Sequence, residues 1–285
     1  MSEELEMLIG MGFDKELSKA ALKAHDGNVQ AACDSLLFQG TADNTPQTTY
    51  RAIQGSISQY DLPHGRSACT CICLEASMAM LSRLQDRPQT LEEVTDDITT
   101  PDAISSIVEV GVITYEAVVA GGLVEAEHTS VPELLDCVTR YKEGLRRALG
   151  IGVYQGVLGS SNSFTTLLHN CREGAGGDAF HTAVTITKPP ETVVAFLPPK
   201  TKSSGSVQGF PAYSCPEPWL LFDSHSRPHL GFTGAHVRVF ESESALVSAL
   251  EELFPPLREE VGGGGGGFLE SMYNMIETVP LRLVV

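Results

Sequence analysis

Apolar side chains repeat at helical spacing in the first 40 residues of the chain. Leu5, Leu8 and Ile9 follow this pattern, and glycine-containing breaks at residues 11–13 and 26–28 interrupt it. Residues three and four apart lie on one face of a helix, so each apolar segment between breaks can bury one face. The pattern therefore predicts three short helices that form a miniature bundle over residues 1–40.

Residues 41–50 are polar and without periodicity, which is typical of a linker, and a second domain is expected over residues 51–285. Its strongest patterns predict helices at Thr70–Leu84, Val131–Leu149, Ser242–Phe254 and Phe268–Ile276, and strands at Phe180–Thr187, Thr192–Leu197, Trp219–Phe222, Val237–Phe240 and Val279–Val285.

Two segments of the second domain give weaker signals. Residues 101–127 mix Ile, Val and Gly, and we expect a helix near 102–108 and a strand near 110–118. The six glycines Gly262–Gly267 predict a flexible segment. Because a helix comes first and most strands follow, the order indicates an α+β class, in which a helical lobe packs against an antiparallel sheet.

Composition narrows the class of protein. The 285 residues include 42% hydrophobic residues and carry a formal net charge of −17, so nucleic acid and anionic membranes, which select basic surfaces, are not expected as partners. We find no signal sequence and no run long and apolar enough to span a bilayer. The seven cysteines are odd in number and lack framework spacing. The chain is therefore expected in the cytoplasm or nucleus, with reduced thiols.

Cys69 stands at the start of the helical run, after Gly65 and with Ser67 as the expected N-cap. The free N–H groups and partial positive charge of a helix N-terminus favour a thiolate over a thiol, so Cys69 is a candidate nucleophile. Cys71 and Cys73 alternate with it by two residues and cannot all face one metal ion. We expect them to be small buried residues, with no metal and no cofactor.

A cysteine nucleophile needs a base, usually histidine, and a group that orients the base. Asp223 and His225 follow the buried strand Trp219–Phe222, and residues two apart on an extended chain share one face. His181 is the rival base, with Asp223 as its acid in the chain order Cys, His, Asp. The spacing leaves both alternatives open.

The N-terminal unit resembles a ubiquitin-associated (UBA) domain. The resemblance rests on the Met11-Gly12-Phe13 loop, the Gly27-Asn28-Val29 turn and the Leu36-Leu37 pair. It implies a three-helix fold whose loop and third helix bind ubiquitin, with Met11, Gly12, Phe13, Leu36 and Leu37 as the contact residues. Gly12 permits the tight turn that would project its neighbours outward.

The second domain resembles the deubiquitinase domain of herpesvirus large tegument proteins and their non-viral relatives. Two short blocks carry the resemblance: Gln54–Tyr60 with Gly65 and Cys69–Cys71, and Phe222–Ser226. The resemblance implies a papain-like fold in which Cys69 is the nucleophile, His225 the base and Asp223 the orienting acid. It also implies that Gln54 helps to form the oxyanion hole, with Gln59 as a second candidate for that amide.

Together these features predict a deubiquitinase that hydrolyses the isopeptide bond at the C-terminus of ubiquitin. Ubiquitin and polyubiquitin chains are the expected partners, and the UBA domain would assist capture of the chains. Two alternatives remain: a non-catalytic ubiquitin-binding adaptor on a degenerate protease scaffold, and a cysteine protease that acts on a ubiquitin-like modifier.

Overall fold

The computed structural model describes residues 4–5, 15–24, 29, 32, 51–86, 100–124, 129–147, 153–159, 163–174, 181–199, 218–256 and 273–284. The chain divides into a small unit, Met1–Gln47 with Pro228–Gly231, and a large unit that comprises Thr48–Arg227 and Phe232–Val285. The expected domain boundaries at residues 40 and 50 lie outside the described residues, and so does the glycine run 262–267.

The small unit contains the helix α2 (Lys15–Ala24). Its buried cluster is formed by Leu5, Ala21, Leu22 and Ala32, against which Val29 packs. Helical residues therefore come from three segments of the sequence, as the apolar pattern predicts. Met11, Gly12, Phe13, Leu36 and Leu37, the expected ubiquitin-contact residues, lie outside the described residues.

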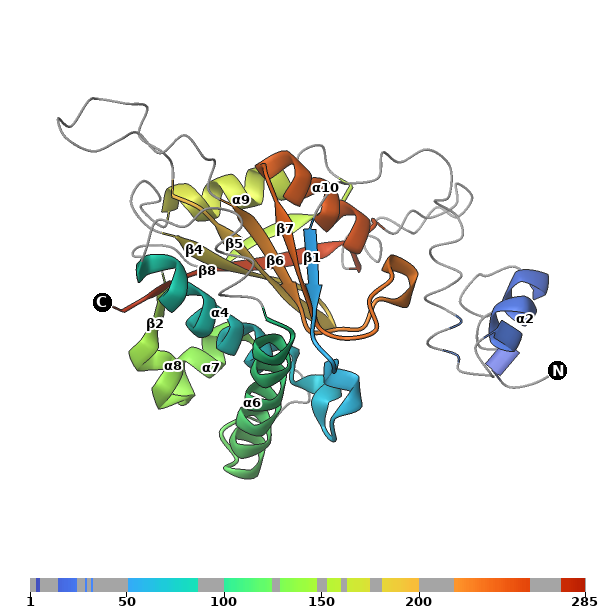
Figure 1. Cartoon of the computed structure of the whole chain (residues 1–285), viewed down its shortest axis with the longest axis horizontal. Helices are drawn as coiled ribbons and strands as arrows, with labels where there is room; N and C mark the ends of the chain where they lie inside the picture. The colour runs from blue at the N-terminus through green and yellow to red at the C-terminus, as the bar shows by residue number, and fades with distance from the viewer. Residues whose placement is uncertain are drawn as a thin grey trace. The chain divides into compact units, whose positions relative to one another are not determined.

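An antiparallel sheet forms the centre of the large unit (Figure 1). In the described part of the chain its strand order is β1-β7-β6-β5-β4-β8-β2, and β3 also pairs with β8. The strands are β1 (Arg51–Gln54), β2 (Leu145–Arg147), β3 (Tyr154–Val157), β4 (Thr182–Lys188), β5 (Glu191–Leu197), β6 (Trp219–Asp223), β7 (His236–Phe240) and β8 (Met275–Leu283).

Helices cover both faces of this sheet (Figure 1). One face receives α4 (Cys69–Asp86), and Leu220 and Phe222 of β6 belong to the same buried cluster as Ile72 of α4. Side chains alternate between the two faces of a strand, so Leu221 points to the other face. That face is covered by α9 (Ser163–Gly174) and α10 (Glu243–Leu253). The two faces explain why β6 is buried at every position.

The helical lobe consists of α4 with α6 (Pro101–Ala120), α7 (Val131–Cys137) and α8 (Thr139–Gly144). Helices α4 and α6 cross at Gly111, where an added Cβ would lie 2.6 Å from the Cα of Ile72. Glycine therefore permits this close approach, and α4 is buried from Cys69 to Ser77. A continuously buried helix in the centre of the unit gives Cys69 a rigid support.

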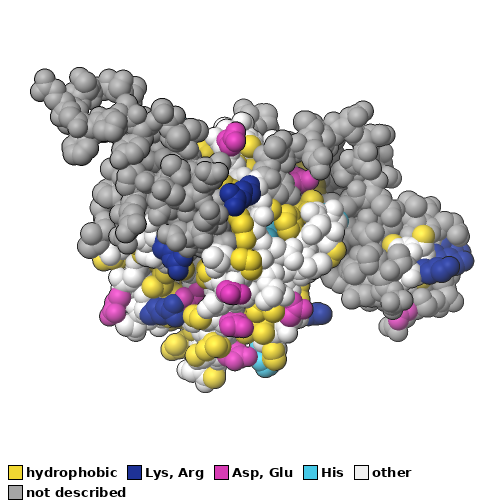
Figure 2. All heavy atoms as spheres, viewed as in Figure 1, with side chains coloured by type: hydrophobic (Ala, Val, Ile, Leu, Met, Phe, Trp, Pro, Cys, Tyr) yellow, Lys and Arg dark blue, Asp and Glu magenta, His cyan; other side chains and the backbone are white. Residues whose placement is uncertain are grey.

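Helix α6 corrects two expectations from the sequence. The strand predicted near 110–118 is wrong, because residues 101–120 form one helix whose N-cap, Thr100, accepts a hydrogen bond from the Ala103 amide. By length and composition α6 could also cross a membrane, contrary to the expectation that no run is apolar enough. One face of α6 packs on α4, whereas Ile113 and Val119 of the helix, and Leu123 just after it, are exposed. Figure 2 shows hydrophobic side chains among acidic ones on the lower part of the surface, where α6 lies in Figure 1.

The other elements differ from the sequence pattern in three ways. The single helix expected over 131–149 breaks at Val138, whose φ of −96° and ψ of 105° are not helical, and the chain enters β2 at Leu145. Strand β8 begins at Met275, within the segment expected as the end of a helix. β1, β3 and α9 were not expected from the sequence.

Candidate active site

Cys69 is the first residue of α4 and follows two short 3₁₀ turns, η1 (Gln59–Asp61) and η2 (Gly65–Ser67). Ser58 caps η1 in a capping box: its Oγ accepts from the Tyr60 amide, and Asp61 accepts from the Ser58 backbone and hydroxyl. Ser67 lies within η2 rather than at the N-cap, and the carbonyl of Ala68 accepts the Ile72 amide at 2.9 Å. Cys69 thus lies in the first turn, as expected.

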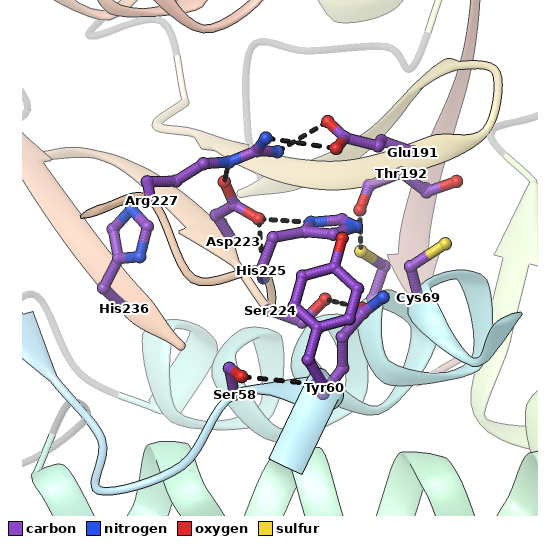
Figure 3. A network of polar contacts seen from close by, with 12 residues as sticks. Ser58, Tyr60, Cys69, Glu191, Thr192, Asp223, Ser224, His225, Arg227 and His236 are labelled. Atoms are coloured by element: carbon purple, nitrogen blue, oxygen red, sulfur yellow. Dashed lines mark hydrogen bonds and ion pairs between the residues drawn. The ribbon is translucent and has the colours of Figure 1, made fainter. Parts of the chain in front are cut away.

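The Cys69 thiol is hydrogen-bonded to the imidazole of His225 (Figure 3). Cys69 is 3% exposed, and its burial opposes ionisation of the thiol. The hydrogen bond and the positive charge of His225 outweigh burial and lower the pKa of Cys69. Hydrogen bonds from the backbone and side chain of Thr192 add to the same effect. The pair is therefore suited to hold a thiolate beside an imidazolium.

Asp223, at the end of β6, orients the imidazole of His225. Its Oδ1 lies 2.6 Å from His225 Nδ1 and 2.9 Å from the His225 amide nitrogen. Burial alone would lower the pKa of His225, yet the charges of Asp223 and Glu191 raise it to about 10. Burial likewise opposes ionisation of Asp223, and Arg227 and His225 reverse this and hold its pKa well below the usual range. Asp223 is therefore a carboxylate.

Gln59 is the glutamine that reaches this cluster. It is fully buried. Its backbone N–H donates to the Ser224 carbonyl at 3.0 Å, and its side-chain Oε1 accepts from the Ser224 hydroxyl at 2.7 Å. Its Nε2 donates to the Arg66 carbonyl at 3.3 Å, which uses one of the two N–H donors of the side-chain amide. Ser224 stands between Asp223 and His225, so Gln59 is fixed to the segment that carries the acid and the base.

Gln54, the amide favoured from the sequence, is engaged elsewhere. It ends β1, and its side chain makes two hydrogen bonds to Thr233: Nε2 donates to Oγ1 at 2.8 Å, and Oε1 accepts from the backbone amide at 3.2 Å. No hydrogen bond described for Gln54 joins it to Cys69, Asp223 or His225. The structure therefore favours Gln59, the second candidate, over Gln54 for the oxyanion hole.

The structure also separates the histidine candidates. His225 bonds the thiol, whereas His181 lies just before β4 and is half-buried. His64, His169 and His229 are exposed. His236 is buried, stacks on Phe232 with ring centroids 3.8 Å apart, and has its pKa lowered to about 4, mainly by burial. The geometry thus agrees with the pair Asp223 and His225 rather than with His181.

The neighbouring cysteines lack the features that distinguish Cys69. Cys71 and Cys73 are fully buried, and burial raises the pKa of Cys71 to about 12 and that of Cys73 well above its ordinary value. The Cys73 thiol donates to the Thr192 carbonyl at 3.2 Å. Among the described residues, no three His, Cys, Asp or Glu side chains gather as metal ligands. Of these three thiols only Cys69 faces a base.

Three residues of the cluster were not identified from the sequence. Arg227 donates from Nε to Asp223 Oδ2 at 2.9 Å and from its two terminal nitrogens to Glu191 at 3.1 and 2.7 Å. The ring of Tyr60 lies over His225, with centroids 5.8 Å apart, and Tyr60 is 46% exposed (Figure 3). The only signals in the sequence for these three residues were the buried strand before Asp223 and the charged Arg227 four residues after Asp223.

Comparison with known proteins agrees with the two resemblances. Residues 2–36 match the family model of the UBA/TS-N domain, so the N-terminal segment is a UBA domain. Among solved structures, the chain is similar to the ubiquitin-specific protease encoded by murine cytomegalovirus tegument protein M48, determined in complex with a ubiquitin-based suicide substrate. That similarity has a TM-score of 0.51 at 13% identity and covers 82% of this chain and 86% of the viral one. No curated protein matches the sequence.

At 13% identity the similarity to the viral protease concerns the fold. The predicted α+β class, a papain-like helical lobe packed against an antiparallel sheet behind a UBA domain, is confirmed. The chain thus combines a UBA domain with the fold of a tegument-type ubiquitin-specific protease.

Proposed function

We propose that the large unit is a deubiquitinase that cleaves the isopeptide bond at the C-terminus of ubiquitin with Cys69 as nucleophile. The observation that carries the proposal is the hydrogen-bonded line from the Cys69 thiol through His225 to Asp223 at the N-terminus of a buried helix. The fold and the UBA domain supply the substrate class, because both are associated with ubiquitin.

The chemistry follows from the geometry. The Cys69 thiolate attacks the carbonyl carbon of the terminal glycine of ubiquitin, and a C–S bond forms as the carbonyl π electrons move to oxygen. The Gln59 amide and the Cys69 backbone N–H would stabilise that oxyanion. On collapse, His225 gives its proton to the leaving lysine amine. His225 then takes a proton from water, which attacks the thioester and releases the ubiquitin carboxylate and the Cys69 thiolate.

The UBA domain would hold one ubiquitin of a chain while another enters the protease site. Tethering raises the effective concentration of the second ubiquitin without any new contact at the site. A mechanism that depends on a free thiolate also suits a reducing compartment, which agrees with the cytoplasm or nucleus expected from the cysteine pattern.

The decisive experiment treats the intact protein with ubiquitin that carries a C-terminal electrophile and locates the adduct by mass spectrometry. We expect an adduct at Cys69, none in Cys69→Ala, and an unchanged adduct in Cys71→Ala. Labelling at Cys71 alone, or no labelling, would refute the nucleophile assignment. Cleavage of ubiquitin chains by the intact protein distinguishes an enzyme from a non-catalytic adaptor, and a panel of ubiquitin-like substrates tests the choice of modifier.

A second comparison addresses the base. We expect His225→Ala to reduce kcat by about 10³-fold or more, since both proton transfers are lost, and His181→Ala to change it by less than about twofold. If only His181→Ala abolishes cleavage, the assignment of His225 is wrong.

A further inference from the structure

The start of β5 lies against the thiol of Cys69. The Pro190 carbonyl oxygen is 3.7 Å from Cys69 Sγ, and Thr192 hydrogen-bonds the same sulfur through its backbone and side chain. Glu191 stands between these two residues. The position of the nucleophile therefore depends on where this end of β5 is held.

Arg227 joins that strand end to the acid of the triad (Figure 3). Two of its nitrogens bind the Glu191 carboxylate, while Nε binds Asp223 Oδ2 and leaves Oδ1 for His225. The Arg227 side chain is 11% exposed and that of Glu191 27% exposed, so water screens these bonds only in part. A planar guanidinium holds two carboxylates in fixed directions, which a lysine ammonium does not.

We propose that Glu191 and Arg227 are positioning residues for the reaction of Cys69. Arg227 fixes the Asp223 carboxylate so that one oxygen faces His225, and Glu191 ties the Pro190–Thr192 segment to Arg227 so that it stays against the thiol. One Glu-Arg-Asp bridge then aligns both the nucleophile and its base. The inference rests on the proposed function for its effect on ubiquitin cleavage, but its effect on Cys69 and His225 can be measured without ubiquitin.

The charges around His225 give the proposal a distinctive signature. Asp223 and Arg227 lie near it in sequence, Glu191 faces it from β5, Cys69 from α4 and Tyr60 from η1, and neutral His236 of β7 lies beside Asp223. Burial opposes protonation of His225, and the Glu191 charge is the second of the charges that raise its pKa. Glu191→Gln keeps the shape and removes the charge, so His225 becomes a weaker base. A residue that only supports the fold would not produce this change.

The test measures the titration of the His225 ring by NMR, the rate of Cys69 alkylation by iodoacetamide at pH 7, and kcat for a ubiquitin–fluorophore conjugate. For Glu191→Gln we expect His225 to titrate about one pH unit lower, alkylation to slow, and kcat to fall about tenfold with KM unchanged. The matched control is Glu243→Gln, which removes the carboxylate of another Arg–Glu pair, to Arg172 at 3.9 Å. We expect it to match the wild type in all three measurements.

Arg227→Gln and Arg227→Lys test the geometry of the bridge. We expect kcat to fall about 10- to 100-fold in Arg227→Gln, with only partial rescue by lysine, which keeps the charge but not the fork. Wild-type titration of His225 together with wild-type kcat in Glu191→Gln overturns the proposal, and so does full rescue by lysine. If the wild type fails to cleave ubiquitin but Glu191→Gln shifts the titration of His225, the proposed function fails while the positioning role stands.

Discussion

Replacing Gly65 with alanine tests how the turn before Cys69 positions Gln59. An added Cβ at Gly65 would lie 2.8 Å from the Gln59 carbonyl carbon and overlap its oxygen, whereas ordinary contacts begin at 3.4 Å. The obstructing atoms belong to the backbone, so no side-chain rotation relieves the overlap. The Gln59 peptide must therefore move by about 1 Å.

The size of the effect follows from what Gln59 holds. Its backbone and its side chain each bond Ser224, at 3.0 and 2.7 Å, so a displaced peptide carries the side-chain amide out of line. A misplacement of about 1 Å costs about 100-fold in rate, and overpacking of a tight contact costs about 1–3 kcal/mol in free energy of unfolding. We expect kcat of Gly65→Ala to fall by about that factor.

The assay measures kcat and KM on a ubiquitin–fluorophore conjugate, with urea unfolding and alkylation of Cys69 in parallel. Alkylation is expected to stay within about twofold of the wild type, because the bond of Cys69 to His225 does not involve Gln59. Gly122→Ala is the control: Gly122 has a φ of 65°, so alanine is strained there, but nothing lies within 4 Å of the added Cβ. We expect it to lose stability and retain kcat. A wild-type kcat in Gly65→Ala would refute this account of Gln59.

Three further predictions concern stability and substrate capture. The pKa values of Asp223 and Glu191 are lowered, mainly because the charges of Arg227 and His225 outweigh burial. The two carboxylates therefore stabilise the folded state above their unfolded pKa values of about 4, and this stabilisation is lost as pH falls through the folded values. Urea unfolding should therefore show a shallower loss of stability below pH 4 in Asp223→Asn than in the wild type, and equal slopes would contradict the linkage. Gly111→Ala should lower the free energy of unfolding by about 1–3 kcal/mol, since its Cβ would lie 2.6 Å from Ile72 Cα, and an unchanged melting temperature would show that α4 and α6 can separate freely. Met11→Ala with Phe13→Ala should slow cleavage of ubiquitin chains about tenfold or more and leave the single-ubiquitin substrate unaffected, whereas equal loss on both would argue against a capture role.

The strands that carry the site were predictable because they are buried on both sides. β4, β5, β6 and β7 read as short apolar runs bounded by turn residues, and their limits fall within two residues of those expected. Residues 110–118 of α6 were wrongly predicted as a strand. Its Val, Ile and Thr side chains favour strands by local preference, but packing against α4 makes them helical. The apolar spacing likewise continues through Val138, because Leu134 of α7, Tyr141 of α8 and Leu145 of β2 are all buried although the helix breaks at Val138.

The site residues that lie close together in the sequence were predictable, whereas contacts between residues that are distant in the sequence were not. The pair Asp223 and His225 is local, so its spacing is visible in the sequence. The choice between Gln54 and Gln59 depends on how Gly65 packs under the Gln59 carbonyl, which no spacing reveals. Glu191 and Arg227 lie 36 residues apart and meet only because β5 and β6 are paired.

The position of β8 in the sheet has a consequence for how the protein is made. β8 follows the other strands in the sequence, yet it lies between β4 and β2 and also pairs with β3. During synthesis, β4 keeps an open edge until residues 275–283 have left the ribosome. Contacts between such distant segments slow folding, and an unpaired edge of a hydrophobic strand invites association with other chains. The sheet of the large unit can therefore be completed only after β8 has been translated, and until then the edge of β4 that β8 covers is open.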